Sequence, residues 1–408
     1  MIEPKTFYRK LDALLRKIGK EKSGKKFLSS IMAEVESSFG EDLRITNGRL
    51  YQEQTSAFAL IAPLEKSKLK QEPKLALDSE AVQRVLQNGS YIFDDPALGA
   101  DFGIEGQREY TIPAAFTVVR NPDRRWLFVF ELKSGWAREE IEFCMNAVRS
   151  ALNYRLFSDA IKNDLQQAAT IQQSLLPSSA PPVRGYEVAG RSQPAELVGG
   201  DLYDYIPFDD EMFGVAIGDA SGHGLPAALL VRDVVTGLRM GLEKEMKMVE
   251  TLKKLNRVIH RSTYSSRFVS LFYGEIESNG NIIYANAGHP APLLVHGERV
   301  VELKASGIII GALPEISLHR GYAFFEPGAV LVLYSDGIFE RQGRDGQQFS
   351  IARLKELAIQ HQAKSAQEIL ETIFNAVYEY GEGANWEDDA TVVVVKKALP
   401  EKSANAGT

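Results

Sequence analysis

The sequence predicts an α+β protein in which a long helix joins two compact domains. Short apolar runs of strand length, such as "VLVLY" and "TVVVV", alternate with amphipathic helical runs in both halves of the chain. Helical spacing also continues without a proline from about residue 140 to 175, where "LLPSSAPP" ends it. The 408 residues suffice for two or three domains of about 100–200 residues each. We expect domains over 1–138 and 186–397, a linker helix over 139–178 and a flexible tail over 398–408.

Composition narrows the class of protein. Hydrophobic residues make up 44% of the chain and charged residues 25%, as in folded proteins. The formal net charge of −7 argues against a general nucleic-acid binder, because phosphate neutralisation needs a basic surface. The single cysteine, Cys144, excludes an intrachain disulfide and fits a reducing cytoplasm. No apolar run approaches the roughly 20 residues of a membrane-spanning helix. We therefore expect a cytoplasmic protein with no membrane span and no nucleic-acid partner.

The first amphipathic segment covers residues 4–20. Its apolar side chains recur at helical spacing and include Phe7, Leu11, Leu14, Leu15 and Ile18. The opposite face is basic, and no apolar segment of the signal-peptide kind follows. Two roles stay open for this helix. It either meets a membrane surface or a partner, or it packs on its own domain and exposes its charged face to water.

Residues 24–135 mix helix and strand signals. "KKFLSSIMAEVESSF" has helical periodicity, and "SEAVQRVLQNGS" begins with a serine cap and stops at Asn-Gly. "AAFTVVRNPDRRWLFVFEL" predicts two strands around the turn Asn121-Pro122-Asp123. This order of elements, followed by the helical "REEIEFCMNAVRSALNYRL", resembles a GAF sensor domain. The resemblance implies that the N-terminal domain binds a small ligand or a partner. We expect no cofactor-binding residues here and a buried, inert Cys144.

The linker carries an apolar stripe in two parts. Ile141, Met145, Val148 and Leu152 follow 4-3-4 spacing. After a break expected near 155–160, a similar stripe is formed by Ile161, Leu165, Ala168 and Leu175. A continuous helix of this length would measure about 54 Å, too long for one small domain to cover. It is expected to form a coiled coil with a second copy, giving a homodimer, or to pack between the domains. Two separate shorter helices are the alternative.

Residues 186–397 are rich in strand-length runs and contain a few long helical runs. The strand candidates include "YEVAGRS", "LYDYIPF", "MFGVAIGD", "FVSLFYGEI", "NIIYANAG", "AVLVLYSD" and "ATVVVVKK". The helical runs are "LPAALLVRDVVTGLRMGL", about 247–262, "IARLKELAIQHQ" and "SAQEILETIFNAVYEYG". Two antiparallel sheets sandwiched between helices would use this inventory.

Several strand ends in this domain carry an aspartate beside glycine, alanine or serine. They are Asp201 in "LVGGD", Asp219 in "VAIGD", Asp336 in "LVLYSDG" and Asp388 in "WEDDATVVVV". Taken alone, any one of them is better explained as a turn or cap residue. Together, carboxylates with small neighbours suit hard divalent cations and leave space for metal-bound water. Like charges brought together also need a cation, because otherwise they repel and their pKa values rise.

A specific set of motifs then identifies the family. "PAELVGGDLYD", "IGDASGHGLPAALL", "YANAGHPAPLL", "GIIIGAL", "LVLYSDGIFE" and "EDDATVVVV" occur in one order over residues 186–397. This half of the chain resembles the metal-dependent PPM phosphatases, in particular their SpoIIE/RsbU-like branch. The resemblance implies an αββα sandwich with a two-metal site at one end, holding two Mn²⁺ or Mg²⁺ ions.

Carried over by position, the resemblance makes Asp201, Asp219, Asp336 and Asp388 metal ligands, with Asp219 bridging the ions. The backbone carbonyl of Ala220 would be a further ligand. The neighbouring acids Asp204 and Asp389 would assist the site or form hydrogen bonds elsewhere.

The resemblance implies hydrolysis of phosphoserine or phosphothreonine, with Asp219 catalytic through the metals. His223 lies between two glycines and would either protonate the leaving oxygen or serve only orientation and packing. His289 and Asn286 are expected to be structural residues near the site.

The RsbU-like resemblance further implies a phosphorylated anti-anti-sigma protein of the STAS type as substrate. A second protein or a small ligand would act on the N-terminal domain. Movement of the helix over 161–176 against the helix over 223–241 is the expected means of control. Two alternatives stay open: a non-catalytic scaffold that binds partners, and a phosphohydrolase that acts on small molecules.

Overall fold

The computed structural model describes residues 4–21, 26–62, 74–95, 98, 100–102, 112–121, 124–177, 179–242, 247–262 and 267–399. The chain divides into two compact units, residues 1–164 (unit 1) and residues 165–408 (unit 2). Most of the tail predicted over 398–408, and part of the turn predicted at 121–123, lie outside the described residues.

Unit 1 contains one six-stranded antiparallel sheet with strand order β3-β2-β1-β6-β5-β4. The strands are β1 (Ile45–Glu53), β2 (Ala57–Ala62), β3 (Lys74–Ala76), β4 (Ser90–Ile92), β5 (Ile112–Asn121) and β6 (Arg124–Leu132). The helices are α1 (Pro4–Lys20), α2 (Phe27–Phe39), α3 (Glu80–Asn88), the short 3-10 turn η2 (Ala100–Phe102) and the start of α5 (Arg138–Gln173).

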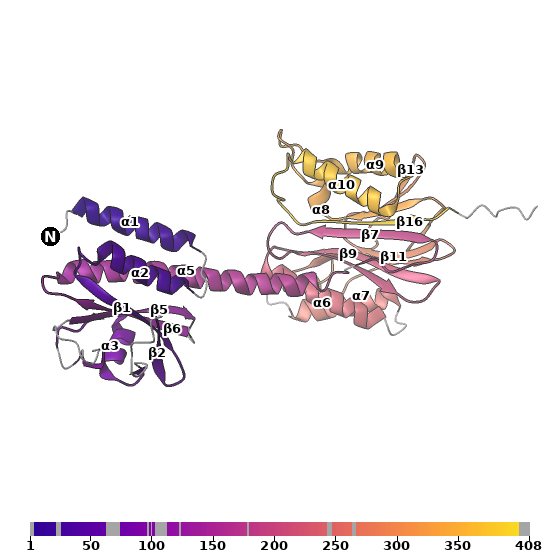
Figure 1. The fold of residues 1–408 in the computed structure, drawn as a ribbon. Helices are drawn as coiled ribbons and strands as arrows, with labels where there is room; N and C mark the ends of the chain where they lie inside the picture. Colours follow the sequence, from indigo (N-terminus) through magenta and orange to yellow (C-terminus); the bar gives the residue numbers. More distant parts are fainter. Residues whose placement is uncertain are drawn as a thin grey trace, which may run out of the picture. The chain divides into compact units, whose positions relative to one another are not determined.

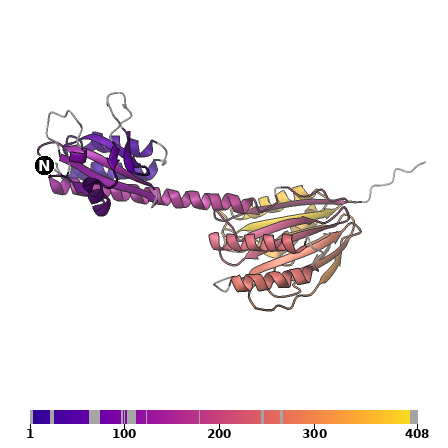
Figure 2. The same ribbon diagram turned by 90° about the horizontal axis from the view of Figure 1, so that it is seen from below.

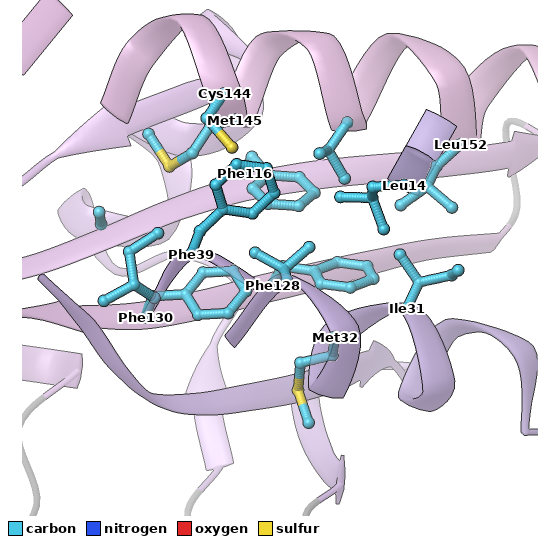
Figure 3. Close-up of a cluster of buried hydrophobic side chains, with 14 of the residues drawn as sticks. Leu14, Ile31, Met32, Phe39, Phe116, Phe128, Phe130, Cys144, Met145 and Leu152 are labelled. Carbon is cyan, nitrogen blue, oxygen red and sulfur yellow. The ribbon is translucent and has the colours of Figure 1, made fainter. Parts of the chain in front are cut away.

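Each face of this sheet has its own apolar core. On one face, α1, α2 and the first half of α5 pack on alternate residues of β5 and β6, including Phe116, Phe128 and Phe130 (Figures 1 and 3). On the other face, α3 packs on residues such as Tyr51 and Leu127. The apolar stripe of α1 is buried in the first core, so this helix packs on its own unit.

Cys144 lies in the first core, among the side chains shown in Figure 3. Burial raises the pKa of its thiol to about 12, so the thiolate needed for reaction with disulfide reagents is nearly absent at pH 8. We expect the native chain to show no reaction with Ellman's reagent over minutes and one thiol per chain in denaturant. Because this is the chain's single cysteine, fast labelling of native protein would contradict the buried position without ambiguity.

Helix α5 runs without interruption from unit 1 into unit 2. The break predicted near 155–160 was wrong: Leu156 is buried there, and Arg155 forms an ion pair with Asp159 one turn later. The predicted stripe from Ile141 to Leu152 is buried in the core of unit 1. The GAF-like nature of unit 1 stays a prediction. In the described part of the chain, no helix is both long enough and apolar enough to cross a membrane.

Unit 2 contains two five-stranded sheets with orders β14-β11-β10-β9-β8 and β13-β12-β15-β16-β7. The first sheet uses β8 (Asp201–Pro207), β9 (Met212–Ala220), β10 (Val269–Glu277), β11 (Asn281–Ala287) and β14 (Gly321–Phe324). The second uses β7 (Tyr186–Gln193), β12 (Leu293–His296), β13 (Arg299–Glu302), β15 (Val330–Tyr334) and β16 (Ala390–Lys397). The helices are α6 (Leu225–Leu242), α7 (Met248–Ser262), α8 (Asp336–Phe339), α9 (Ser350–His361) and α10 (Ala366–Tyr380).

The sheets of unit 2 face each other and carry helices on their outer faces. Helices α6 and α7 lie side by side over the first sheet, and α9 and α10 cover the second (Figures 1 and 2). In β16, Val393 and Val395 point into the layer between the sheets, whereas Val392 and Val394 point under the helices. The unbroken valine run is therefore that of an interior strand buried on both faces. The arrangement is the αββα sandwich expected from the sequence.

Candidate active site

Four aspartates predicted from the sequence lie at strand ends on one edge of the sandwich. Asp201 begins β8 and pairs directly with Asp219 near the end of β9. Asp336 follows β15, and Asp388 precedes β16, which is the antiparallel neighbour of β15. Because side chains opposite each other in an antiparallel pair share a face, Asp201 and Asp219 point the same way. They follow the parity of Tyr203 and Ile217, which belong to the layer between the sheets.

Hydrogen bonds join the end of β15 to the start of β16. The amide of Ser335 donates to the carbonyl of Thr391 at 3.0 Å, and the amide of Thr391 donates to Ser335 Oγ at 2.9 Å. Gly337 follows Asp336, and a Cβ at that position would lie 2.2 Å from the carbonyl oxygen of Asp389. Glycine is therefore needed for the turn after β15 to approach the start of β16 this closely.

The pKa values of three of these carboxyl groups are raised, as expected for a crowded group of acids. Burial, with the charge of Asp219 next, holds the pKa of Asp201 well above its usual range. Burial, followed by the charges of Asp336 and Asp388, raises the pKa of Asp219 to about 7. Burial and the charge of Asp388 also raise the pKa of Asp336. These carboxylates lie close enough to destabilise one another's charged forms, which a nearby cation would reverse.

Small residues let the backbone segments beside these acids approach one another closely. A Cβ on Gly200 would lie 2.7 Å from the carbonyl oxygen of Ala220 and 3.3 Å from Asp219 Oδ1. Gly222 has a φ of 91°, in the left-handed region that favours glycine. The sequence "ASGHG" thus turns the chain sharply after β9, and the missing Cβ at Gly200 leaves room beside the Ala220 carbonyl.

His223 follows Asp219 by four residues in the sequence, and its side chain lies at the surface. Its imidazole is 87% exposed, and its Nδ1 lies 3.3 Å from Oε1 of Glu196. Glu196 belongs to the segment that leads into Asp201. No role was expected for Glu196 from the sequence, because nothing in its own segment indicates a contact with a distant histidine.

His289 and Asn286 are buried in one hydrogen-bonded loop. Asn286 Oδ1 accepts from the backbone amide of His289 at 2.9 Å, and its Nδ2 donates to the carbonyl of Leu303 at 3.1 Å. His289 Nδ1 lies 2.9 Å from Ser270 Oγ, and burial lowers the pKa of the imidazole to about 3. A neutral, buried imidazole with these contacts orders the loop next to β10.

Asp204 is directed away from the four acids. Both of its carboxylate oxygens accept hydrogen bonds from Arg239 of α6, at 2.7 and 2.9 Å. Arg239 also donates to the carbonyl of Leu175, just after α5. A pocket of about 400 Å³ lies on this side, with Asp204 and Arg239 in its wall together with Pro177 and Pro181. Asp204 therefore ties β8 to α6.

The donor set fits a hard divalent cation. Oδ2 of Asp201 is buried and has no hydrogen-bond partner among the described residues, which is costly for a carboxylate unless a cation or water meets it. Within the described ranges, no three His, Cys, Asp or Glu side chains come together closely enough to hold one ion by themselves. Mg²⁺ commonly binds through one or two carboxylates and keeps several waters, so such an ion does not need three protein side chains.

The last turn of α5 contacts the segment that precedes Asp201. The side-chain amide of Gln172 is buried and pairs with Gly199: Nε2 donates to the Gly199 carbonyl, and the Gly199 amide donates to Oε1 at 3.1 Å. Ala169 of α5 also packs with Val198 and with Ala228 of α6. The sequence placed this helix before the domain but gave no signal for these contacts.

Replacing Gln172 by alanine is expected to lower the catalytic rate about tenfold, because two hydrogen bonds to a segment next to Asp201 are lost. Gln173→Ala is the matched control, since Gln173 is the exposed neighbour. Rates with p-nitrophenyl phosphate at saturating Mn²⁺ would test this. Equal rates for the two variants would show that the contact does not affect the site.

Comparison with known proteins shows what most of unit 2 is similar to. The family described as Stage II sporulation protein E (SpoIIE) matches residues 209–398. Phosphoserine phosphatase RsbU of Bacillus subtilis is 28% identical over 243 residues, covering 59% of this chain and 71% of RsbU. Phosphoserine phosphatase RsbP of the same organism is 26% identical over 223 residues, covering 50% of this chain and 55% of RsbP.

A solved structure supports the fold. The SiaA-PP2C domain of Pseudomonas aeruginosa aligns with a TM-score of 0.53 at 21% identity, over 59% of this chain and 98% of that domain. The family match covers Asp219, Asp336 and Asp388 and begins after Asp201. Residues 209–398 therefore form a SpoIIE-type domain with the fold of the PP2C-type phosphatases, and this domain lies in unit 2.

Proposed function

We propose that this chain is a regulated protein phosphatase that removes phosphate from serine or threonine, using two Mn²⁺ or Mg²⁺ ions. The observation that carries the proposal is the convergence of Asp201, Asp219, Asp336 and Asp388 at one edge of the sandwich. Such a site needs no nucleophilic side chain, and the chain's single cysteine is buried in unit 1. The relatives RsbU and RsbP are phosphoserine phosphatases, which supports the same substrate class.

In this proposal the four aspartates and the Ala220 carbonyl would hold the ions, and Asp219 would be a ligand that both ions share. The paired positions of Asp201 and Asp219 support a shared ligand role. When bound, divalent ions lower the pKa of a coordinated water toward neutrality and offset negative charge on the phosphoryl oxygens.

The remaining steps belong to the chain's own residues. The exposed imidazole of His223 can reach a bound phosphoester and donate a proton to the departing serine oxygen. Glu196 would hold Nδ1 of His223, so that Nε2 faces the substrate. His289 is buried and does not take part.

We propose a phosphorylated STAS-type protein as the physiological substrate, by analogy with the partner-switching relatives. A protein or small ligand acting on unit 1 would supply the regulation. The contact of Gln172 with the Gly199 backbone supports α5 as the connecting element. The single cysteine supports a cytoplasmic location.

We also propose a homodimer formed through the linker helix. A line of exposed apolar side chains runs along the part of α5 in unit 1 and comprises Phe143, Tyr154, Phe157 and Ile161. At about 100° per residue, these positions fall within one ~60° sector of the helix. Tyr154 is 78% exposed and Phe157 60% exposed, and large exposed apolar side chains gathered on one face are typical of an interface. This exposed stripe shares Ile161 with the second part of the stripe predicted from the sequence, whereas unit 1 buries the first part, Ile141 to Leu152, in its core.

Phe157→Asp is expected to convert the dimer to a monomer, because a carboxylate in an apolar interface must be desolvated. Folding should be unaffected, since the side chain is exposed within the chain. Light scattering coupled to size exclusion would report the mass, with Asn163→Asp on the opposite side of the helix as control. A wild-type chain that is monomeric at micromolar concentration would refute this interface.

The decisive test of the proposed function uses a phosphorylated STAS protein as substrate. We expect Mn²⁺-dependent release of phosphate from it at a rate well above that from free nucleotides. Preference for nucleotides would indicate a small-molecule phosphohydrolase. Failure to hydrolyse any phosphoester with Mn²⁺ would indicate a scaffold.

A further inference from the structure

The second acid of the "DDAT" motif has contacts unlike those of the four aspartates assigned to the metals. Asp389 is buried, and both of its carboxylate oxygens accept backbone hydrogen bonds from the segment before β8. The Ala195 amide donates to Oδ1 at 2.8 Å, and the Gly200 amide donates to Oδ2 at 2.5 Å. By contrast, Oδ2 of Asp201 has no partner in the described structure.

The backbone of Asp389 is equally engaged. Its amide donates to Oδ1 of Asp388 at 2.8 Å, and its carbonyl accepts from Ser335 Oγ at 3.2 Å. One residue thus contacts the segment before Asp201, the neighbouring Asp388, and the serine before Asp336. The first partner precedes β8 of one sheet, and the other two flank β16 and β15 of the other sheet.

The segment before β8 is shaped to receive this carboxylate. A Cβ on Gly199 would lie 2.6 Å from Asp389 Oδ2, so glycine is required there for the backbone to approach. Hydrogen bonds from backbone amides to a carboxylate are charge-assisted and are stronger than neutral ones. The segment 195–200 is therefore anchored by a buried charge one residue before Asp201.

We propose that Asp389 is a positioning residue that holds the 195–200 segment, and with it Asp201, against the start of β16, and that it does not bind metal. The proposal deepens the proposed function and rests on it for the role of Asp201. It gives different roles to two adjacent acids of one motif. Asp388 would bind the ions, and Asp389 fixes the segment that leads into Asp201.

The test compares the full-length wild type with Asp389→Asn, Asp388→Asn and the surface control Asp210→Asn. Asparagine keeps the shape of Asp389 but can accept with one oxygen only, and its NH₂ group faces a second donor. Hydrogen exchange of metal-free protein would be measured over peptides that contain Ala195 and Gly200. We expect exchange there to rise about tenfold or more in Asp389→Asn alone, with β10 and β11 unchanged.

The second readout is activation by Mn²⁺ with p-nitrophenyl phosphate. We expect Asp389→Asn to need about tenfold more Mn²⁺ and to recover activity at saturation, because a displaced Asp201 binds more weakly. Asp388→Asn should not recover. Unchanged hydrogen exchange in Asp389→Asn would overturn the proposal. It would also be overturned if, at saturating Mn²⁺, Asp389→Asn were as inactive as Asp388→Asn.

Two further arms keep the outcome clear. If Asp389→Asn fails to fold, Gly199→Ala displaces the same contact from the other side and should accelerate exchange of the same peptides. If the wild type shows no Mn²⁺-dependent hydrolysis, the proposed function fails, while the exchange comparison still decides whether Asp389 anchors the segment.

Discussion

Asp219→Asn is expected to lower metal-dependent hydrolysis of p-nitrophenyl phosphate by about a thousandfold or more. Metal ions contribute several kcal/mol of transition-state stabilisation, and each ~1.4 kcal/mol changes the rate tenfold. Asp219 is opposite Asp201 and feels the charges of Asp336 and Asp388. An amide at its position removes the ligand that the proposal places between the two ions.

The loss should not come from unfolding. Replacing one of several crowded carboxylates by a neutral amide removes repulsion in the metal-free protein, so we expect equal or greater resistance to urea without metal. Asp210→Asn, in the exposed turn before β9, is the matched control and should retain full activity. A variant at Asp219 that keeps more than about a tenth of the wild-type rate would contradict a bridging role.

The largest effect on stability is expected for Arg341→Met. The Arg341 side chain is fully buried, and its Nη1 donates to the carbonyl of Asn385 at 2.6 Å and to Glu387 Oε2 at 3.0 Å. Nη2 donates to the Ala384 carbonyl at 2.7 Å, and the guanidinium lies 5.0 Å from the ring centre of Trp386. Removing a buried charge whose two Nη atoms are hydrogen-bonded costs about 3 kcal/mol.

This change should also affect the site, because the segment fixed by Arg341 leads directly into Asp388. We expect a higher Mn²⁺ requirement together with lower stability. Trp386 is the single tryptophan of unit 2, so its fluorescence in a Trp126→Phe, Trp136→Phe background reports unfolding of that unit. Arg344→Met, at a side chain that is 86% exposed, should change neither quantity. A loss below about 1 kcal/mol for Arg341→Met would show that the loop is held by other contacts.

Much of unit 2 could be predicted because its signals are local. Apolar runs of strand length ended at aspartate and small residues, and antiparallel pairing then brought those ends to one edge. The turn after β9 was visible in "ASGHG", since two glycines there have positive φ. The short strand β13 gave no signal, because its four residues are half exposed and lack a clear alternation.

Other features depend on partners distant in sequence. Contacts with the backbone or side chains of other segments define the roles of four residues: Gln172, Glu196, Asp389 and Arg341. None of them stands in a periodic pattern that would mark its role. The 4-3-4 stripe at Ile141–Leu152 showed that one face of α5 is buried, but the same spacing serves a core or a dimer, and unit 1 uses it for its core.

The position of β16 has a consequence for synthesis on the ribosome. Strand β7 pairs with β16 and lies at the edge of its sheet, and the hydrogen-bonded Ser192 and Thr391 are 199 positions apart. A nascent chain must therefore carry β7 without its neighbour until translation has passed Lys397. Such late closure makes folding slow and exposes an unpaired edge to aggregation. Chaperone dependence during expression, relieved when residues through Lys397 have emerged, follows from this topology.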